Sequence, residues 1–73
     1  MNKLFDQQFC DSINKKIGSQ VGRKKAVGEI SKRLDSFYGQ SLGIDKIMRL
    51  VHHRLGDTKE VTPEVLEAIK DKI

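Results

Sequence analysis

Apolar residues recur at helical spacing in four segments of this chain. In residues 43–55, Ile44, Ile47, Met48, Val51 and Leu55 follow the i, i+3, i+4, i+7 spacing that places side chains on one helical face. The same periodicity predicts helices over residues 2–17, 23–35 and 63–72, whereas alternation with a period of two is limited to residues 59–61. The pattern therefore predicts an all-α fold, a compact four-helix domain that spans residues 1–73.

The first predicted helix carries signals at both of its ends. Asn2 is expected to cap its start, and Gly18 is expected to end it in the left-handed conformation common after helices. Cys10 lies beside the apolar stripe, so we interpret it as a small buried hydrophobe and not as a reactive thiol. The stripe itself consists of Phe5, Phe9, Ile13 and Ile17.

The second predicted helix has an inner stripe and one glycine. Gly28 weakens this helix, and a reason for its presence would be close helix packing. Either Phe37 or Tyr38 is expected to continue the stripe, with Tyr38 filling the edge of the core in preference to stacking on a base. The stripe consists of Ala26, Val27, Ile30 and Leu34.

The start of the last predicted helix has the most complete set of sequence signals. Thr62 is expected as the N-cap and Pro63 as the first helical residue, where its missing N–H costs nothing. Val61 can pack on Leu66 across the helix start as a hydrophobic staple.

Length and composition narrow the class of protein. A chain of 73 residues forms one small domain with a thin core, and its single cysteine cannot form an internal disulfide. No apolar run approaches the roughly 18 residues that span a bilayer, and the N-terminus lacks a signal-peptide core. We therefore expect a soluble cytoplasmic protein, associated with the nucleoid if it binds DNA.

The positive charge is concentrated in the middle of the chain. Residues 12–56 carry ten lysines and arginines against three acids, a net charge of +7, whereas residues 1–11 carry −1 and residues 57–73 carry −2. A block of this kind favours an anionic partner, nucleic acid first. The alternative is a solvated surface that serves solubility.

The helix over residues 43–55 presents a basic outer row opposite its apolar stripe. Lys46, Arg49 and His53 are expected to reach base edges in the DNA major groove, with Arg49 suited to a bidentate contact with guanine. The predicted contacts with the DNA backbone, which set affinity and salt dependence, are Arg23, Lys24, Lys25, Lys32, Gln40 and Ser41.

The sequence offers no set of residues typical of an enzyme, a metal site or a cofactor site. His52 and His53 are adjacent, so on a helix they point about 100° apart, and there is no second cysteine or HxxxH pair to complete a site. We find no Ser/His/Asp or Cys/His arrangement, and a chain of this length leaves little room for a pocket. We therefore predict no enzyme activity, no metal and no cofactor.

Residues 47–69, IMRLVHHRLGDTKEVTPEVLEAI, resemble the end of the DNA-binding headpiece in LacI-type repressors. In those headpieces an arginine-containing recognition helix is followed by a loop and a helix that starts with Val-Ser/Thr-Pro-Glu. More broadly, the chain resembles small Cro-like or repressor-like helix-turn-helix proteins of phages and plasmids. The resemblance implies a dimeric, operator-binding regulator.

The sequence departs from those families at the turn before the recognition helix. The families use a tight three-residue turn, whereas SFYGQSLG (residues 36–43) is longer and places Phe37 where a small residue belongs. Either the turn is expanded or the pair is not a true helix-turn-helix.

Taken together, these features predict a sequence-specific protein that binds double-stranded DNA, a small transcriptional regulator in which residues 43–55 form the recognition helix. We expect a homodimer with no small-molecule substrate; Leu42, Leu50 and the outer residues of the last helix are candidates for its interface. The alternative is a helical protein-interaction module, of the antitoxin, anti-restriction or adaptor kind, whose basic face docks an acidic partner. RNA binding by the same face is a third possibility, although no aromatic platform is visible.

Overall fold

Four helices joined by short connections account for most of the chain. The computed structural model describes residues 5–39, 43–56 and 58–72. Over these ranges the elements are α1 (Gln7–Lys16), α2 (Gln20–Phe37), α3 (Ile44–Leu55) and α4 (Pro63–Lys72), and no strand occurs among them. The prediction of an all-α four-helix domain is confirmed.

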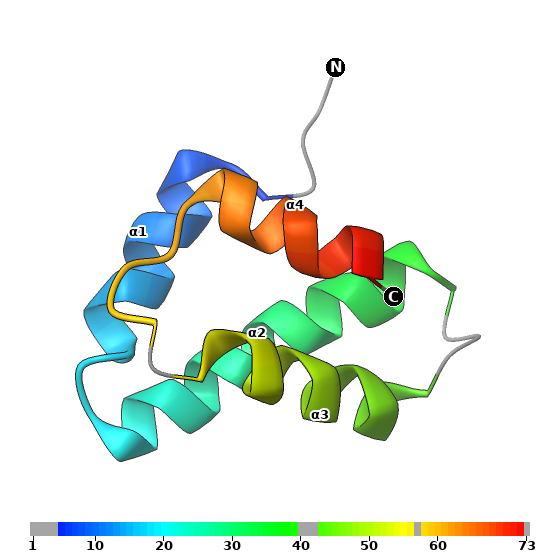
Figure 1. Cartoon of the computed structure of the whole chain (residues 1–73), viewed down its shortest axis with the longest axis horizontal. Helices are drawn as coiled ribbons and strands as arrows, with labels where there is room; N and C mark the ends of the chain where they lie inside the picture. The colour runs from blue at the N-terminus through cyan, green and yellow to red at the C-terminus, as the bar shows by residue number, and fades with distance from the viewer. Residues whose placement is uncertain (1–4, 40–42, 57, 73) are drawn as a thin grey trace.

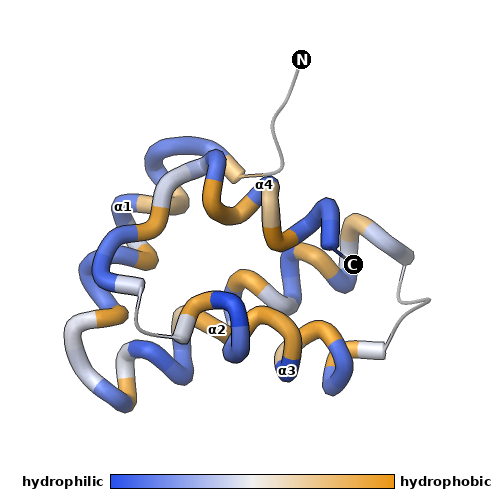
Figure 2. The backbone as a smooth tube through the Cα atoms, in the orientation of Figure 1, coloured by the Kyte–Doolittle hydropathy of each residue, from blue (hydrophilic) through white to orange (hydrophobic). Residues whose placement is uncertain are grey.

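Helix α2 is the central element of the fold. Its most extensive contact is with α3, while α1 packs against α2, and α4 packs against α3. Helices α2 and α3 run in opposite directions, and α4 lies above both of them in the view of Figure 1. The apolar residues lie mainly on the inward faces of the helices (Figure 2). The buried core comprises Phe5, Cys10, Ile13, Ile17, Ala26, Val27, Ile30, Leu34, Ile47, Val51, Leu55, Val61, Leu66 and Ile69.

Helix α1 begins later than the apolar pattern predicts. Asp6 is its N-cap and accepts a hydrogen bond from the Phe9 N–H at 2.8 Å, so a cap at Asn2, which lies outside the described residues, is not what starts this helix. Phe5 precedes the helix yet is fully buried, with its ring centroid 5.5 Å from that of Phe9. The apolar spacing of four residues therefore extends past the start of α1, because Phe5 fills the core without being helical.

A tight connection joins α1 to α2. Ile17 ends α1 in a right-handed conformation, so Gly18 does not supply the predicted left-handed stop. Ser19 caps α2 by accepting a hydrogen bond from the Gly22 N–H at 3.0 Å. Helix α2 therefore starts at Gln20, three residues before the predicted bound, and it ends two residues after the other predicted bound.

Close packing of the backbone occurs at Gly22 and not at Gly28. A Cβ atom on Gly22 would lie 1.9 Å from the backbone oxygen of Lys16, whereas one on Gly28 would meet nothing within 4 Å. The prediction that Gly28 permits close helix packing is wrong, since the space that its side chain would occupy is open. The glycine that matters for packing stands where α2 turns back on the end of α1.

The start of α4 follows its sequence signals. Thr62 Oγ1 accepts a hydrogen bond from the Val65 N–H at 3.2 Å, and Pro63 is the first helical residue. Val61 and Leu66 are both fully buried in the same core, as a hydrophobic staple requires. In the ranges described, no helix has the length and apolar character needed to cross a membrane.

Two neighbouring aromatic residues at the end of α2 have different environments. Tyr38 packs against the core and donates a hydrogen bond from its hydroxyl to the Lys70 backbone oxygen at 2.9 Å. Phe37 is 54% exposed, with Lys70 Nζ 5.1 Å from its ring centroid. Tyr38 is therefore the residue that continues the inner stripe, which confirms its predicted place at the core edge and ties α2 to α4.

Candidate nucleic-acid interface

The outer row of α3 is assembled as the sequence predicts. Ile47, Val51 and Leu55 are buried against the rest of the core, which turns the opposite side of the helix to solvent. Lys46, Arg49 and His53 are all exposed there. Together with the half-buried Leu50, these three side chains line one open hollow.

Met48 departs from the predicted apolar stripe of α3. It is 38% exposed and lines the groove between α2 and α3. The stripe placed it toward the core because its spacing from Ile44 and Ile47 is helical. However, the Met48 side chain lies on the flank of α3 that faces α2, where a groove between the two helices is open to solvent.

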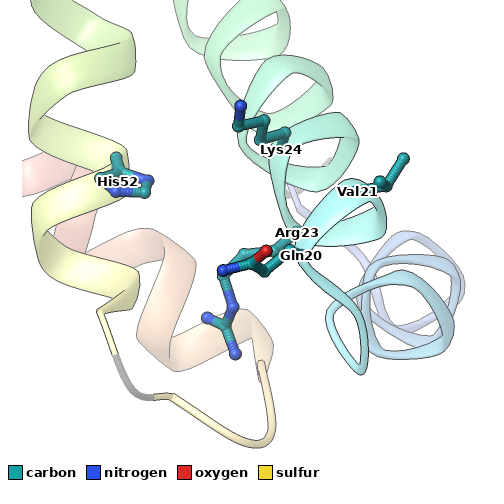
Figure 3. Close-up of a pocket in the computed structure, with 5 residues that line it drawn as sticks. All are labelled: Gln20, Val21, Arg23, Lys24 and His52. Atoms are coloured by element: carbon teal, nitrogen blue, oxygen red, sulfur yellow. The ribbon is translucent and has the colours of Figure 1, made fainter.

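A groove between α2 and α3 extends the basic surface beyond the predicted row. The residues of α2 that line the groove are Lys24 and Val27. The lining residues from α3 are Asp45, Met48, Arg49 and His52. Lys24 and His52 also line a second hollow with Gln20, Val21 and Arg23, at the start of α2. In Figure 3, His52 and Lys24 lie on opposing sides of this hollow, while Val21 points away from α3.

These hollows share residues, so they form one continuous surface. Arg49 joins the outer row of α3 to the groove, and Lys24 and His52 join the groove to the start of α2. We call the surface formed by Lys24, Lys46, Arg49, His52 and His53 the basic band. Among the described residues, the ion pairs join Lys16 with Glu29 and Lys70 with Glu67, and neither uses a side chain of this band. The cations of the band are therefore available to an external anion.

Arg23 makes contacts that its predicted role did not anticipate. Its guanidinium donates to the backbone oxygens of Gly56 at 2.9 Å, Thr58 at 3.1 Å and Ile17 at 3.3 Å. Three carbonyl groups from two different connections thus converge on one side chain. The structure gives Arg23 a role in holding the end of α3 against the start of α2, and its predicted contact with a DNA phosphate stays untested.

The other predicted backbone contacts lie apart from the band. Lys25 and Lys32 are exposed on the outer side of α2 and do not line the hollows described above. Gln40 and Ser41 fall outside the described residues, as does Leu42, a candidate for the dimer interface. Of the four predicted backbone contacts that lie among the described residues, Lys24 is the one that lines the groove together with Arg49 of the α3 row.

Sequence reasoning missed His52 and Asp45 as parts of this surface. Both stand on the α2-facing flank of α3, about 100° or less from residues that were singled out. Their relevance depends on the antiparallel contact of α2 with α3, which brings Lys24 opposite His52. A helical wheel of α3 alone contains no signal for that pairing.

The two histidines serve separate parts of the surface. His52 lines the groove, whereas His53 lines the hollow of the outer row. Within the part of the chain that the structure describes, no three histidine, cysteine, aspartate or glutamate side chains gather closely enough to hold a metal ion.

The connection between α2 and α3 bears on the helix-turn-helix resemblance. Helix α2 is 18 residues long and ends at Phe37, and α3 begins at Ile44. Six residues separate these helices, where the repressor families use a three-residue turn. The exposed side chain of Phe37 explains how a bulky residue is accommodated, since it does not enter the interface between the helices.

Comparisons with known proteins return no counterpart of this fold or sequence. The chain matches no protein-family model, no curated protein and no solved structure. The resemblance of residues 47–69 to repressor headpieces therefore stays a prediction.

Proposed function

We propose that this protein binds double-stranded DNA through the basic band and acts as a small sequence-specific transcriptional regulator. The observation that carries the proposal is the continuity of the band, which joins cationic side chains of two helices without internal ion pairs among the described residues. A surface of this kind matches the regularly spaced charges of a duplex.

The two parts of the band divide the work of recognition. The outer row of α3 belongs to an exposed helix face, the kind of element that fits the major groove. Arg49 is the residue best suited to a bidentate contact with guanine, and Lys46 and His53 flank it. Lys24 on α2 and His52 on the flank of α3 lie beside this outer row, where they contact the phosphates that border the major groove. Lys25 and Lys32 add to the long-range attraction.

A titration of affinity against salt concentration tests this proposal. Fluorescence anisotropy with a random duplex is measured between about 50 and 200 mM salt, where release of counterions makes log K fall linearly with log salt. Lys24→Gln is expected to reduce the slope by about 0.9, the value for one phosphate contact in B-DNA. Lys15→Gln, which removes the same charge from α1, is the matched control and is expected to leave the slope nearly unchanged.

Two results would refute the proposal. One is the absence of duplex binding at about 50 mM salt, where electrostatic binding is strong. The other is an equal change of slope in Lys24→Gln and Lys15→Gln, because a surface without a defined interface would respond to net charge alone.

A second candidate function is the docking of an acidic protein. The exposed Met48 and the half-buried Leu50 favour it, because methionine and leucine beside cations are typical of surfaces that bind amphipathic partners. Affinity purification would then return one dominant acidic protein that nuclease treatment does not release. Loss of every partner on nuclease treatment would favour the DNA-binding proposal.

A further inference from the structure

Asp45 is an acidic side chain in an otherwise cationic groove. It is exposed in the first turn of α3 and lines the groove together with Lys24, Arg49 and His52. Among the described residues that line the three hollows, no other carries a negative charge. A carboxylate repels phosphates, so this residue lowers the affinity of the band for any polyanion.

A purely local role for Asp45 would concern helix stability. A carboxylate in the first turn interacts favourably with the positive end of the helix dipole. That role operates in the free protein, and it places no demand on the residues that surround the carboxylate. The groove, however, puts Asp45 beside an arginine with which it can act on a ligand.

Asp45 and Arg49 lie on the same flank of α3. They are four positions apart in the sequence, which is about one helical turn and about 6 Å along the axis. Both line the groove, and the ion pairs found among the described residues do not join them. One hydrogen-bond acceptor and one set of donors are therefore presented side by side to whatever enters the groove.

Base edges in the major groove offer the complementary groups. Cytosine presents its N4 amino group as a donor, and guanine presents O6 and N7 as acceptors. The rise of about 3.4 Å per base pair places contacts that are about 6 Å apart one or two base pairs from each other. A carboxylate and a guanidinium at this spacing thus match a short G·C-containing site.

We infer that Asp45 is a specificity-determining residue that accepts a hydrogen bond from a cytosine N4 amino group while Arg49 contacts guanine. This inference rests on the proposed function, because it requires α3 to enter the major groove. The negative charge of Asp45 then makes binding sequence-dependent. At the correct site a cytosine amino group donates to the carboxylate, whereas at other sites the carboxylate is repelled by phosphates or by base acceptors.

Selection from a randomised duplex pool, followed by sequencing of the bound fraction, tests the inference. The unaltered protein is expected to enrich cytosine at one position and guanine one or two base pairs away. Asp45→Ala is expected to lower the cytosine preference by roughly 5- to 150-fold while raising affinity for random duplex. Asp45→Asn is expected to shift the preference toward adenine, because an amide pairs with adenine N6 and N7.

Matched controls separate base reading from folding and net charge. Asp71→Ala removes the same charge from the exposed end of α4 and is expected to leave the base preference unchanged. Thermal melting of Asp45→Ala establishes whether it is folded at the assay temperature, and Asp45→Asn, which conserves size, repeats the test if it is not.

The possible failures are distinguishable. If the unaltered protein binds no duplex, the proposed function fails and this inference fails with it. If it binds duplex but both Asp45 variants retain the original cytosine preference, the role of Asp45 is confined to helix α3 and only this inference is overturned. Binding of duplex with no base preference in the unaltered protein would overturn the sequence specificity in the proposed function together with this inference.

Discussion

Arg23 and Lys24 are adjacent in the sequence, yet their side chains serve different parts of the molecule. The Arg23 guanidinium donates to three backbone oxygens, one in the α1–α2 connection and two in the α3–α4 connection. The Lys24 side chain instead lines the groove, across from His52 (Figure 3). Charge alone predicted phosphate contacts for both. Their roles differ because successive side chains on a helix point about 100° apart, so Arg23 points toward the connections while Lys24 points toward the groove.

Replacement of each residue by methionine separates these roles. Arg23→Met is expected to lower the free energy of unfolding by about 2 kcal/mol, since it removes charge-assisted hydrogen bonds to several carbonyl groups. In a domain of this size such a loss lowers the melting temperature by about 10 °C. Lys24→Met is expected to change stability by less than about 0.5 kcal/mol. Thermal unfolding followed by circular dichroism measures both, and equal losses would contradict a structural role for Arg23.

At the level of the helices, the capping signals of α4 were a better guide than the apolar spacing and the Asn2 cap predicted for α1. The start of α4 followed from Thr62 and Pro63, because a side-chain cap and a proline act locally. The start of α1 did not follow from Phe5, since burial against distant residues extended the apolar pattern past the helix. The Asp6 cap was available in the sequence, and it was the more local signal.

The two glycines of α2 give an opposed pair of predictions. Gly22→Ala is expected to destabilise the protein by at least about 2 kcal/mol, because its Cβ would overlap the Lys16 backbone oxygen and force α1 and α2 apart. Gly28→Ala is expected to stabilise it by up to about 1 kcal/mol, since alanine is the better helix former and the space is open. Chemical denaturation of both variants measures the effects, and a stabilised Gly22→Ala would show that the connection is not tightly packed.

At the scale of the whole molecule, the fold gathers charge that is dispersed in the sequence. Burial raises the pKa of the Cys10 thiol, and the nearby carboxylates of Asp11, Asp6 and Glu64 raise it further. These acids come from the first and last helices, whose starts lie together on the side of the molecule away from α3 (Figure 1). Asp6, Asp11 and Glu64 therefore lie near one another, away from the basic band, and this asymmetry would orient the protein as it approaches a polyanion.

The sequence was sufficient for some features of this molecule because they depend on neighbours along the chain. The outer row of α3 required helical periodicity alone, and Lys46, Arg49 and His53 were found from it. The groove required the position of α2 beside α3, so His52 and Asp45 were missed and Met48 was placed in the core. The homodimer stays a prediction, and its candidate residues among those described are Leu50, which lies beside the band, and the outer residues of α4.

Two polar side chains fasten the irregular segment that leads from α3 to α4. Arg23 holds the Gly56 and Thr58 carbonyl groups, while Asn14 donates to the Val61 oxygen at 2.9 Å and accepts from the Val61 N–H at 2.6 Å. Val61 itself is fully buried. A stretch without regular secondary structure is thus bonded to both α1 and α2.

Native-state hydrogen exchange should therefore find this stretch within the slowest-opening cooperative unit of the protein. The Val61 amide is expected to exchange only through global unfolding, together with amides of α2, because its release requires α1 and α4 to separate. Asn14→Ala is expected to admit local opening and to speed that exchange selectively, whereas Gln8→Ala, at an exposed site on α1, is the control. Rapid exchange of Val61 in the unaltered protein would mean that α4 detaches on its own.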